Sequence, residues 1–507
     1  MTSRRQAVDF AIAQDSEPTL EANSSANTAN ETLANETLAN ETFQWTQQWY
    51  PVSVVEMLDP SRPHPIQLLG KSLVIWRDTQ QQWHCFEDAC PHRLVPLSEG
   101  RVEADGTLLC AYHAWRFDAE GKCTHIPQSK DAAIEAACRA REKACAIAYP
   151  TREAQGLLWV WPESGDAGKV QSQSRSPRLI DELEAPSSQV KALSWNQRDL
   201  PYGWDYFMEN VSDPAHVPVS HHGIMGSRYT DATYYDMLRL REVSTQEGFA
   251  FKVQTSSEDF FTTSHDFQPP CLMRITMTYK DSGQLILVLY ATPTKPGWCR
   301  HMGRQVFVKN KAGKAPPGLG FLALPMPKWL NHIVGSLFLH QDLAFLHHQE
   351  RTMNKRKLAS PGRRWTDEVY TPNPQDKMVI TFRRWLEQEA GGGIPWDESC
   401  DLALPSLDKE QLFDVWAVHT QHCQHCQKAL KRIDIAIMLC FVAAVGLLVA
   451  GVMFDARTIA LQRIWTWPPL TFWGLIVGAG GLAIGGRLLQ KLKTLFFTYR
   501  FEHADND

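Results

Sequence analysis

The sequence contains few cysteines, little net charge and no apolar segment at its start. Twelve cysteines in 507 residues are far fewer than a disulfide-stabilised extracellular domain contains, and they suit a reducing compartment. The net charge is -5, without a long block of lysine and arginine, so nucleic acid is not expected as a partner. The opening residues MTSRRQAVDFAIAQDSEP include acids and no long apolar run, which argues against a secretory signal or an organelle transit peptide and favours a prokaryotic host.

Changes in composition along the chain predict several domains. Apolar residues make up 44% of the sequence, enough for more than one hydrophobic core. The near-repeat ANETLANETLANETF has neither helix nor strand periodicity, which predicts a disordered tether over residues 1–44. Short apolar runs such as SLVIW and GLLWVW, separated by turn residues, predict an antiparallel β domain over 45–165 and a polar linker over 166–190. From 191 to 400 strand-like and helix-like segments are mixed, which predicts an α+β domain.

Two uncharged apolar segments lie near the C-terminus. Residues 435–454 and 467–486 are each long enough to cross a hydrocarbon core of about 30 Å as a helix. Lysine and arginine are denser outside the pair than between its members, so both chain ends are expected on the cytoplasmic side. The pattern predicts a juxtamembrane segment over 401–433 and an anchor of two transmembrane helices over 434–507. Buried core helices are the alternative, which the length of both segments disfavours.

Two short motifs combine cysteine with histidine. They are Cys90-x-His92 and Cys110-x-x-His113. Two thiolates and two imidazoles suit a [2Fe-2S] cluster in which the cysteines hold one iron and the histidines hold the other. A zinc site with the same ligands is the alternative, but zinc fingers pair cysteine with cysteine and histidine with histidine.

A second set of candidate ligands lies in DYFMENVSDPAHVPVSHHG, residues 205–223. Non-haem Fe(II) sites in oxygenases use two imidazoles and one carboxylate, with open positions for O₂. If a helix begins at Tyr206, Asp213 and His216 lie on one face of it, and Pro218 ends the helix so that His221 follows in the next turn. Two imidazoles of this stretch can thus converge on one metal ion, whereas a lone histidine is more often a surface or core residue.

A CxxC motif precedes the first apolar segment. Cys423 and Cys426 lie among His419, His422 and His425. Three interpretations remain open, namely a dithiol switch, half of a zinc site and an inert turn. The spacing and the nearby cations, which lower thiol pKa values, favour the switch.

The cysteine and histidine motifs resemble those of the Rieske family. Respiratory Rieske proteins add a disulfide between the two cluster loops, but Val95 and Tyr112 lie in those regions here, so the oxygenase branch is the better match. Together with the second ligand set, the CxxC and the C-terminal hairpin, residues 45–507 resemble the pheophorbide a oxygenase and Tic55-like group.

This resemblance implies an α+β multidomain fold, with a β-sandwich-like Rieske domain, a helix-grip (START-like) catalytic domain and a transmembrane helical hairpin. It selects His216 and His221, within the pattern N-x-x-D-x-x-H-x-x-x-x-H, and Asp342, within HQDLAFLHHQE, as ligands of a mononuclear non-haem Fe(II). His222 and Glu350 are the alternatives to these ligands.

The resemblance also implies a mechanism and partners. Asp213 bridges a cluster histidine of a neighbouring subunit to His216, so a homotrimer is expected. The activity is that of a membrane-anchored monooxygenase, which takes electrons from reduced ferredoxin and inserts oxygen from O₂ into an apolar cyclic tetrapyrrole such as pheophorbide a. The expected location is the thylakoid or plasma membrane of a photosynthetic prokaryote. The alternative is a redox-sensing Rieske component of a membrane complex that uses the CxxC without pigment turnover.

Overall fold

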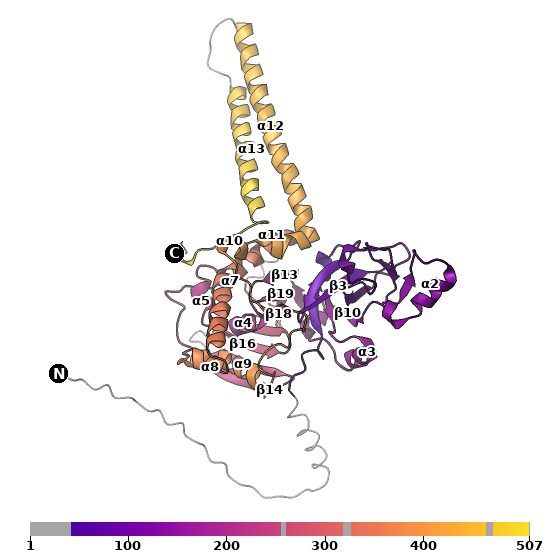
Figure 1. Ribbon diagram of the computed structural model, residues 1–507. Helices are drawn as coiled ribbons and strands as arrows, with labels where there is room; N and C mark the ends of the chain where they lie inside the picture. The colour runs from indigo at the N-terminus through magenta and orange to yellow at the C-terminus, as the bar shows by residue number, and fades with distance from the viewer. Residues whose placement is uncertain (1–41, 255–259, 318–325, 463–469, 506–507) are drawn as a thin grey trace, which may run out of the picture. The chain divides into compact units, whose positions relative to one another are not determined.

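The computed structural model describes residues 42–254, 260–317, 326–462 and 470–505 (Figure 1). Most of the predicted tether lies outside these residues, but Phe43, near its end, is folded. Its side chain is 2% exposed, and its ring packs edge-on against Trp45 at 5.3 Å and Trp385 at 5.5 Å. The predicted boundary at residue 44 is therefore too late, because the last aromatic residue of the near-repeat belongs to a hydrophobic core.

The N-terminal domain consists of three small antiparallel sheets, as expected for a β-rich Rieske domain. Their strands, in spatial order, are β1 (Tyr50–Val54), β11 (Leu157–Val160) and β10 (Thr151–Ala154); β2 (His64–Leu68), β3 (Lys71–Arg77), β4 (Trp83–Glu87) and β9 (Ala148–Tyr149); and β5 (Arg101–Val102), β6 (Leu108–Leu109), β7 (Arg116–Phe117) and β8 (Cys123–His125). One short helix, α2 (Ala132–Arg139), follows β8.

The sequence of β3 contains a continuous apolar run, SLVIW, because both faces of the strand are buried. Successive side chains of a strand point to opposite faces. Leu73 and Ile75 enter a core shared with β1 and β11, whereas Val74 and Trp76 enter a second core that contains Cys90 and the cluster loops. The strand therefore separates two cores and is buried on both faces.

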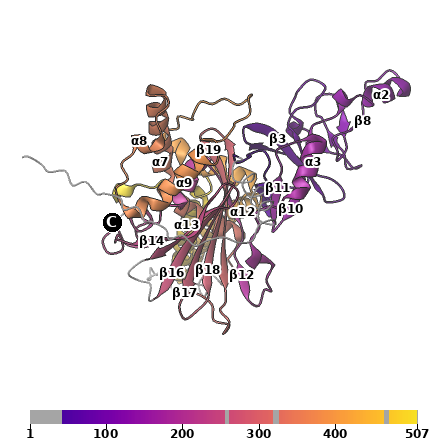
Figure 2. The same cartoon turned by 90° about the horizontal axis from the view of Figure 1, so that it is seen from below.

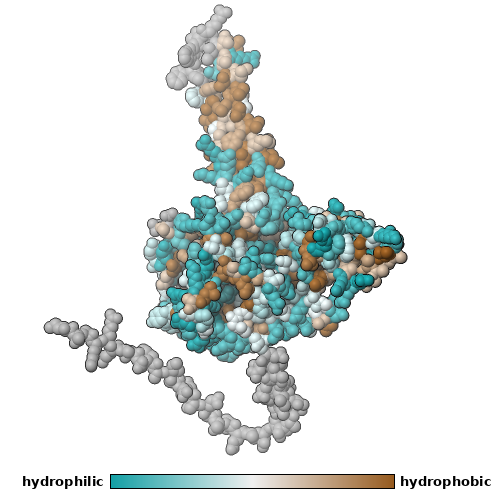
Figure 3. All heavy atoms as spheres, viewed as in Figure 1, coloured by the Kyte–Doolittle hydropathy of each residue, from teal (hydrophilic) through white to brown (hydrophobic). Residues whose placement is uncertain are grey.

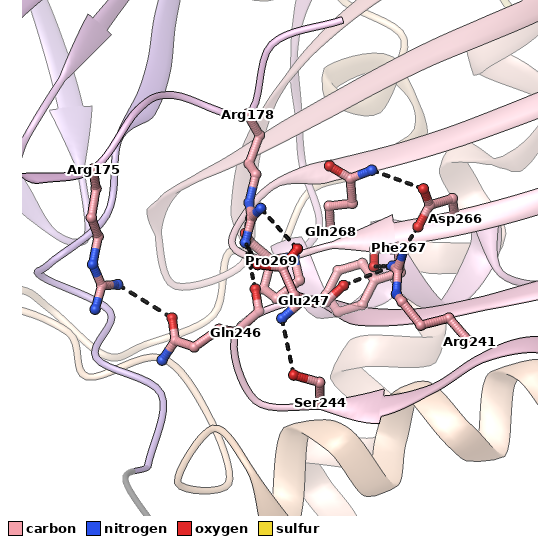
Figure 4. A network of polar contacts seen from close by, with 10 residues as sticks. All are labelled: Arg175, Arg178, Arg241, Ser244, Gln246, Glu247, Asp266, Phe267, Gln268 and Pro269. Carbon is pink, nitrogen blue, oxygen red and sulfur yellow. Dashed lines mark hydrogen bonds and ion pairs between the residues drawn. The ribbon is translucent and has the colours of Figure 1, made fainter. Parts of the chain in front are cut away.

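The segment predicted as a polar linker is folded and makes specific contacts. It contains α3 (Gly165–Ser174) and the 3-10 helix η4 (Asp181–Glu184). Figure 4 shows Arg175 and Arg178 reaching the turn between two strands of the following sheet. Arg178 contacts the Glu247 carboxylate at 3.0 Å and donates to the Gln246 carbonyl at 2.5 Å, while Arg175 donates to the Gln246 side chain at 3.2 Å. Its polar residues thus hold this segment against the catalytic domain.

The second domain, which the resemblance predicts to be the catalytic domain, is built on one large antiparallel sheet. Its spatial order is β12 (Val190–Ala192), β19 (Trp298–Val308), β18 (Gln284–Lys295), β17 (Leu272–Tyr279), β16 (Phe261–Gln268), β15 (Gly248–Gln254) and β14 (Asp236–Ser244), with β13 (Asn196–Leu200) also paired to β19. The helices are α4 (Trp204–Val211), α5 (Val217–Ser220), α7 (Lys328–Ala359), α8 (Trp365–Glu368) and α9 (Lys377–Gln388).

Helices α7 and α9 pack on this sheet through a shared core (Figure 2). Phe251 and Phe267 of the sheet meet Leu343 of α7 and Phe382 of α9 in that core. One of the helix-like segments predicted between 191 and 400, SLFLHQDLAFLHHQERTMNK, lies entirely within α7. The arrangement confirms the expected α+β fold and brings α7, with Asp342, against α4 and the sheet.

The C-terminal part continues the catalytic domain before it enters the helical hairpin. It comprises α10 (Lys409–Leu412), α11 (Val415–Val418), η6 (Thr420–His422), α12 (Gln424–Gln462) and α13 (Leu470–Thr494). Leu412 and Phe413 belong to the catalytic core, so the predicted juxtamembrane segment is not separate from that domain. After α13 the chain returns, and His503 Nε2 lies 2.7 Å from the Gln341 carbonyl oxygen of α7.

Helices α12 and α13 have the length and composition of membrane spans. Only 11% of the most apolar stretch of each is buried within the protein, which disfavours the alternative of buried core helices. Figure 3 shows hydrophobic residues along the hairpin and polar residues where it joins the catalytic domain. The first predicted span, 435–454, lies within α12. The second, 467–486, lies within α13 from Leu470 onward, and its first three residues fall outside the part of the chain that the structure describes.

Candidate active site

Two loops of matching geometry present the cysteine and histidine motifs of the N-terminal domain. They are Cys90–Val95 and Cys110–Trp115. In each loop the cysteine N–H donates to the carbonyl oxygen of the last residue, at 2.8 and 2.9 Å. Leu94 and Ala114 occupy the same place in the two loops, and both have a φ of 57°. This positive φ is costly for residues other than glycine, so the surrounding structure must hold both turns in place.

The four side chains of these motifs converge in two pairs. Cys90 and Cys110 are each 1% exposed and interact electrostatically with one another, while the rings of His92 and His113 lie 4.7 Å apart. Burial raises the pKa of Cys90 to about 12, so a bound cation is needed to keep its thiolate there. Separate cysteine and histidine pairs fit a [2Fe-2S] cluster, whose two irons they bind respectively.

The turn that carries Asp213 and His216 differs from the predicted helix. Helix α4 ends at Val211, because Pro214 has no N–H to donate and disfavours helical geometry in the residue before it. Asp213 instead accepts the Ala215 N–H at 2.8 Å. The prediction that Asp213 and His216 share a helix face is therefore wrong, although both side chains lie near each other.

The next proline lies at the start of a helix instead. Pro218 lies in the first turn of α5 rather than at the end of a helix, since proline is well tolerated at a helix start. His216 precedes this short helix and His221 follows it. The two histidines therefore flank one helical turn.

The structure brings His216, His221 and Asp342 together. Each offers a ligand atom, and these atoms all lie within 4.8 Å of one another. Asp342 Oδ2 lies 3.1 Å from His221 Nε2 and 3.6 Å from His216 Nε2. Two imidazoles and one carboxylate match the facial triad of non-haem Fe(II) oxygenases, so these residues fit that metal.

An oxygen acceptor lies beside the outer nitrogen of each histidine. Gln341 Oε1 is 2.7 Å from His221 Nδ1, within hydrogen-bond distance, whereas Asp213 Oδ2 is 3.6 Å from His216 Nδ1 and acts on it through its charge. Such partners favour the tautomer in which Nδ1 carries the proton and Nε2 presents its lone pair to a metal. The two imidazoles are thus oriented toward the Asp342 carboxylate.

The charge distribution of the site favours a cation. Burial opposes protonation of His216, but the carboxylates of Asp213 and Asp342 outweigh it and raise its pKa to about 10. Burial likewise opposes ionisation of Asp342, yet His216 and His221 outweigh it and lower the pKa of that carboxyl. A metal ion would replace the proton that the two carboxylates otherwise attract.

The two alternative ligands are engaged elsewhere. His222 Nδ1 accepts the Arg228 N–H at 3.0 Å, and Glu350 accepts the Gly203 N–H, at the start of α4, at 2.9 Å. Neither belongs to the group formed by the other three side chains.

Two neighbours of the site were missed by sequence reasoning. Gln341 directly precedes Asp342, and Phe338, one turn earlier on α7, stacks on His221 at 3.9 Å. For Phe338 the available signal was its spacing of four residues before Asp342, because residues four apart share a helix face. Gln341 is adjacent to Asp342 and gave no such signal. Asn210, part of the recognised pattern, lies 3.4 Å from His216 Nε2 and 3.5 Å from Asp342.

The CxxC cysteines lie away from this group. Cys423 and Cys426 are free thiols, each 1% exposed. Redox-active cysteines are usually partly exposed, so this burial disfavours the predicted dithiol switch.

The chain is similar to known oxygenases over most of its length. The family model described as Rieske [2Fe-2S] domain matches residues 48–139, and the model described as Pheophorbide a oxygenase matches residues 267–359. The chain is 33% identical over 426 residues to "Pheophorbide a oxygenase, chloroplastic" of Arabidopsis thaliana, which covers 81% of this chain and 77% of that protein. The chain belongs to the pheophorbide a oxygenase family.

The chain is also similar to a second curated protein and to a solved oxygenase structure. It is 29% identical over 487 residues to "Flavonoid 8-hydroxylase 2, chloroplastic" of Ocimum basilicum, covering 91% of this chain and 86% of that protein. The crystal structure of dicamba monooxygenase bound to dicamba matches with a TM-score of 0.52 at 18% identity, covering 69% of this chain and 98% of that chain. This likeness shows a shared fold, and family membership makes the chain a Rieske oxygenase.

Proposed function

We propose that this protein is a membrane-anchored monooxygenase that uses electrons from reduced ferredoxin and O₂ to oxygenate an apolar cyclic tetrapyrrole, pheophorbide a or a related chlorophyll pigment. The observation that carries the proposal is the convergence of His216, His221 and Asp342 in a chain that also contains a Rieske domain. The similarity to pheophorbide a oxygenase over 81% of the chain supports the substrate class.

In this proposal Cys90, His92, Cys110 and His113 hold the [2Fe-2S] cluster. The convergent group of α5 and α7 holds the Fe(II), which supplies O₂ activation when bound. The protein's own contribution is to orient the ligands, through the acceptors at the outer nitrogens of both histidines, and to leave the remaining positions around the metal free of protein ligands.

Asp213 is proposed to link two copies of the chain in a homotrimer. Its side chain is 30% exposed, so it can accept a hydrogen bond from His92 or His113 of a neighbouring copy while facing His216. Leu94 and Tyr112, next to the cluster histidines, are 75% and 57% exposed. An exposed apolar rim of this kind suits a contact between copies.

The hairpin of α12 and α13 is proposed to anchor the enzyme in a thylakoid or plasma membrane, with the folded domains on the cytoplasmic side. A large apolar ring partitions into membranes, so an anchor shortens the path between substrate and active site. The alternative of a redox-sensing component that uses the CxxC has less support, because both thiols are buried.

The test is turnover by the full-length protein in detergent, with ferredoxin, its reductase and O₂. A panel of chlorophyll pigments and flavonoids is supplied, and product masses are read by mass spectrometry. His216→Ala removes a candidate ligand, and His222→Ala is the matched control at a neighbouring histidine outside the group.

We expect one pigment to gain oxygen with wild-type protein and with the His222 variant, but not with the His216 variant. Oxygenation of a flavonoid alone would overturn the tetrapyrrole assignment. Failure to convert any compound, with both iron centres occupied and reducible, would contradict the oxygenase proposal.

A further inference from the structure

Four potential metal ligands meet where the catalytic domain joins the helical hairpin. They are His332 near the start of α7, His419 after α11, and Cys423 and Cys426 of the CxxC. Their ligand atoms all lie within 4.8 Å of one another, and their side chains are between 1% and 5% exposed. Asp342 lies ten residues beyond His332 on the same helix, which is about 15 Å along its axis. The group is thus distinct from the candidate iron site.

The distances within the group match a tetrahedral zinc site. His332 Nδ1 lies 3.4 Å from Cys426 Sγ and 3.5 Å from Cys423 Sγ, and His419 Nε2 lies 3.3 Å from Cys426 Sγ. Zinc bonds of about 2.3 Å to sulfur and about 2.0 Å to nitrogen, at the tetrahedral angle, separate sulfur from nitrogen by about 3.5 Å. The two sulfurs are not joined in a disulfide. The group therefore needs only small adjustments to enclose a metal ion.

The outer contact of His419 has the form expected of a metal ligand. Its Nδ1 lies 2.7 Å from the Gln197 carbonyl oxygen, which can only accept a hydrogen bond, so Nδ1 carries the proton. Nε2 then presents its lone pair toward the cysteines, as in metal sites whose histidines donate to a backbone carbonyl.

The charges of the group also balance around Zn²⁺. Two thiolates and two neutral imidazoles bring the total charge with the ion to zero, which avoids the cost of burying a net charge. Binding releases the two thiol protons to solvent, so the step needs no oxidant or reductant.

Residues between and beside the ligands connect several parts of the chain. Gln424, between the two cysteines, donates to the carbonyl oxygens of Glu56 at 3.0 Å and Leu58 at 2.8 Å in the N-terminal domain. Thr420 donates to the Phe496 carbonyl oxygen at 2.7 Å, after the hairpin returns. The four ligands thus lie at a junction of the Rieske domain, the catalytic domain and the anchor.

We infer that His332, His419, Cys423 and Cys426 bind one Zn²⁺ as a structural site. All four positions are filled by protein side chains, which distinguishes a structural zinc site from a catalytic one with an open position. The ion ties the start of α12 to α7, the helix that carries Asp342. The inference does not depend on the pigment or on the oxygenase reaction.

The first test is metal analysis of the full-length protein, purified in detergent from zinc-supplemented cells. Inductively coupled plasma mass spectrometry should find about one zinc per chain in addition to iron. The double variant Cys423→Ser with Cys426→Ser should lose the zinc and keep the iron. Cys440→Ser, a half-buried cysteine on α12 outside the group, and His422→Ala, beside His419, should keep both metals.

A second measurement covers the case in which the double variant does not fold. In wild-type protein, Cys423 and Cys426 should resist alkylation until a chelator is added, and peptide masses should then show two free thiols. Wild-type protein without zinc, a disulfide between these cysteines, iron in place of zinc, or zinc that persists in the double variant would each overturn the inference.

Discussion

Asparagine in place of Asp213 removes a charge beside His216 while keeping the local turn. An asparagine side chain retains the oxygen that accepts the Ala215 N–H at 2.8 Å. The second carboxylate oxygen, 3.6 Å from His216 Nδ1, becomes an amide NH₂ that cannot accept a proton from that nitrogen. The variant therefore tests the charge and orientation of the histidine rather than the fold.

The contact distance sets the size of the effect. A unit positive charge 3.6 Å from the Asp213 carboxylate would interact with it by about 4 to 5 kcal/mol at an effective dielectric constant of about 20. A metal-bound His216 is a neutral imidazole whose N–H carries only part of that charge, so this value is an upper bound. Because the side chains of Asp213 and His216 are 30% and 20% exposed, solvent screening reduces this to roughly 2 kcal/mol. That free energy corresponds to a decrease in activity of about 30-fold. This lies within the range of about 10- to 100-fold seen when a metal-binding histidine loses its outer partner.

Two quantities are measured. The first is the iron content of each variant, and the second is the rate at which the reduced cluster is reoxidised when the protein is mixed with O₂ and the pigment that wild-type protein converts. Asp213→Asn should keep most of its iron, whereas reoxidation and turnover fall together by about 30-fold. Asp376→Asn is the control, because that carboxylate interacts electrostatically with Asp213 but lies outside the ligand group. If the cluster of Asp213→Asn is reoxidised at the wild-type rate, or if Asp376→Asn slows reoxidation equally, the proposed role of Asp213 is refuted.

Two further predictions concern buried charges around α4. Burial and the nearby Asp205 carboxylate raise the pKa of Glu350 to about 8, so the contribution of Glu350 to stability is greatest below its unfolded pKa of about 4.3 and is lost as the pH rises to about 8. Glu350→Gln should raise the melting temperature at pH 9 and change it little at pH 4; an equal effect at both values would contradict this assignment. Arg383, 3% exposed, lies 2.6 Å from Asp205 and 2.5 Å from Glu209, so Arg383→Met should cost about 3 to 5 kcal/mol in denaturant unfolding. The exposed neighbour Arg384→Met should cost little, and similar losses in both variants would rule out the buried ion pairs as the cause.

Local motifs made the two ligand sets partly predictable. The cysteine and histidine spacing in the cluster loops identified both halves of the Rieske site, because each half is a short loop held by its own backbone hydrogen bonds. The helix that carries Asp342 was predictable as a helix from its composition, but its position opposite His216 and His221 came only from the family resemblance. No local sequence pattern predicts that two elements 121 residues apart are in contact.

Other features depend on tertiary structure. His332 lies 91 residues before Cys423 and has no motif spacing to it, so sequence reasoning placed only His419, His422 and His425 near the CxxC. The predicted helix through Asp213 failed because Pro214 outweighed the three-residue spacing of the polar side chains. Likewise, the polar linker composition concealed Arg175 and Arg178, which make specific contacts rather than remain solvated.

We propose that this chain transfers oxygen from O₂ to a tetrapyrrole at the group formed by His216, His221 and Asp342. The most direct measurement is turnover of pheophorbide a and related pigments under ¹⁸O₂, followed by product mass spectrometry. Wild-type protein should form product that carries ¹⁸O from the gas, and Asp342→Ala should form none. Product whose added oxygen comes from water, or ¹⁸O incorporation that persists in Asp342→Ala, would contradict it.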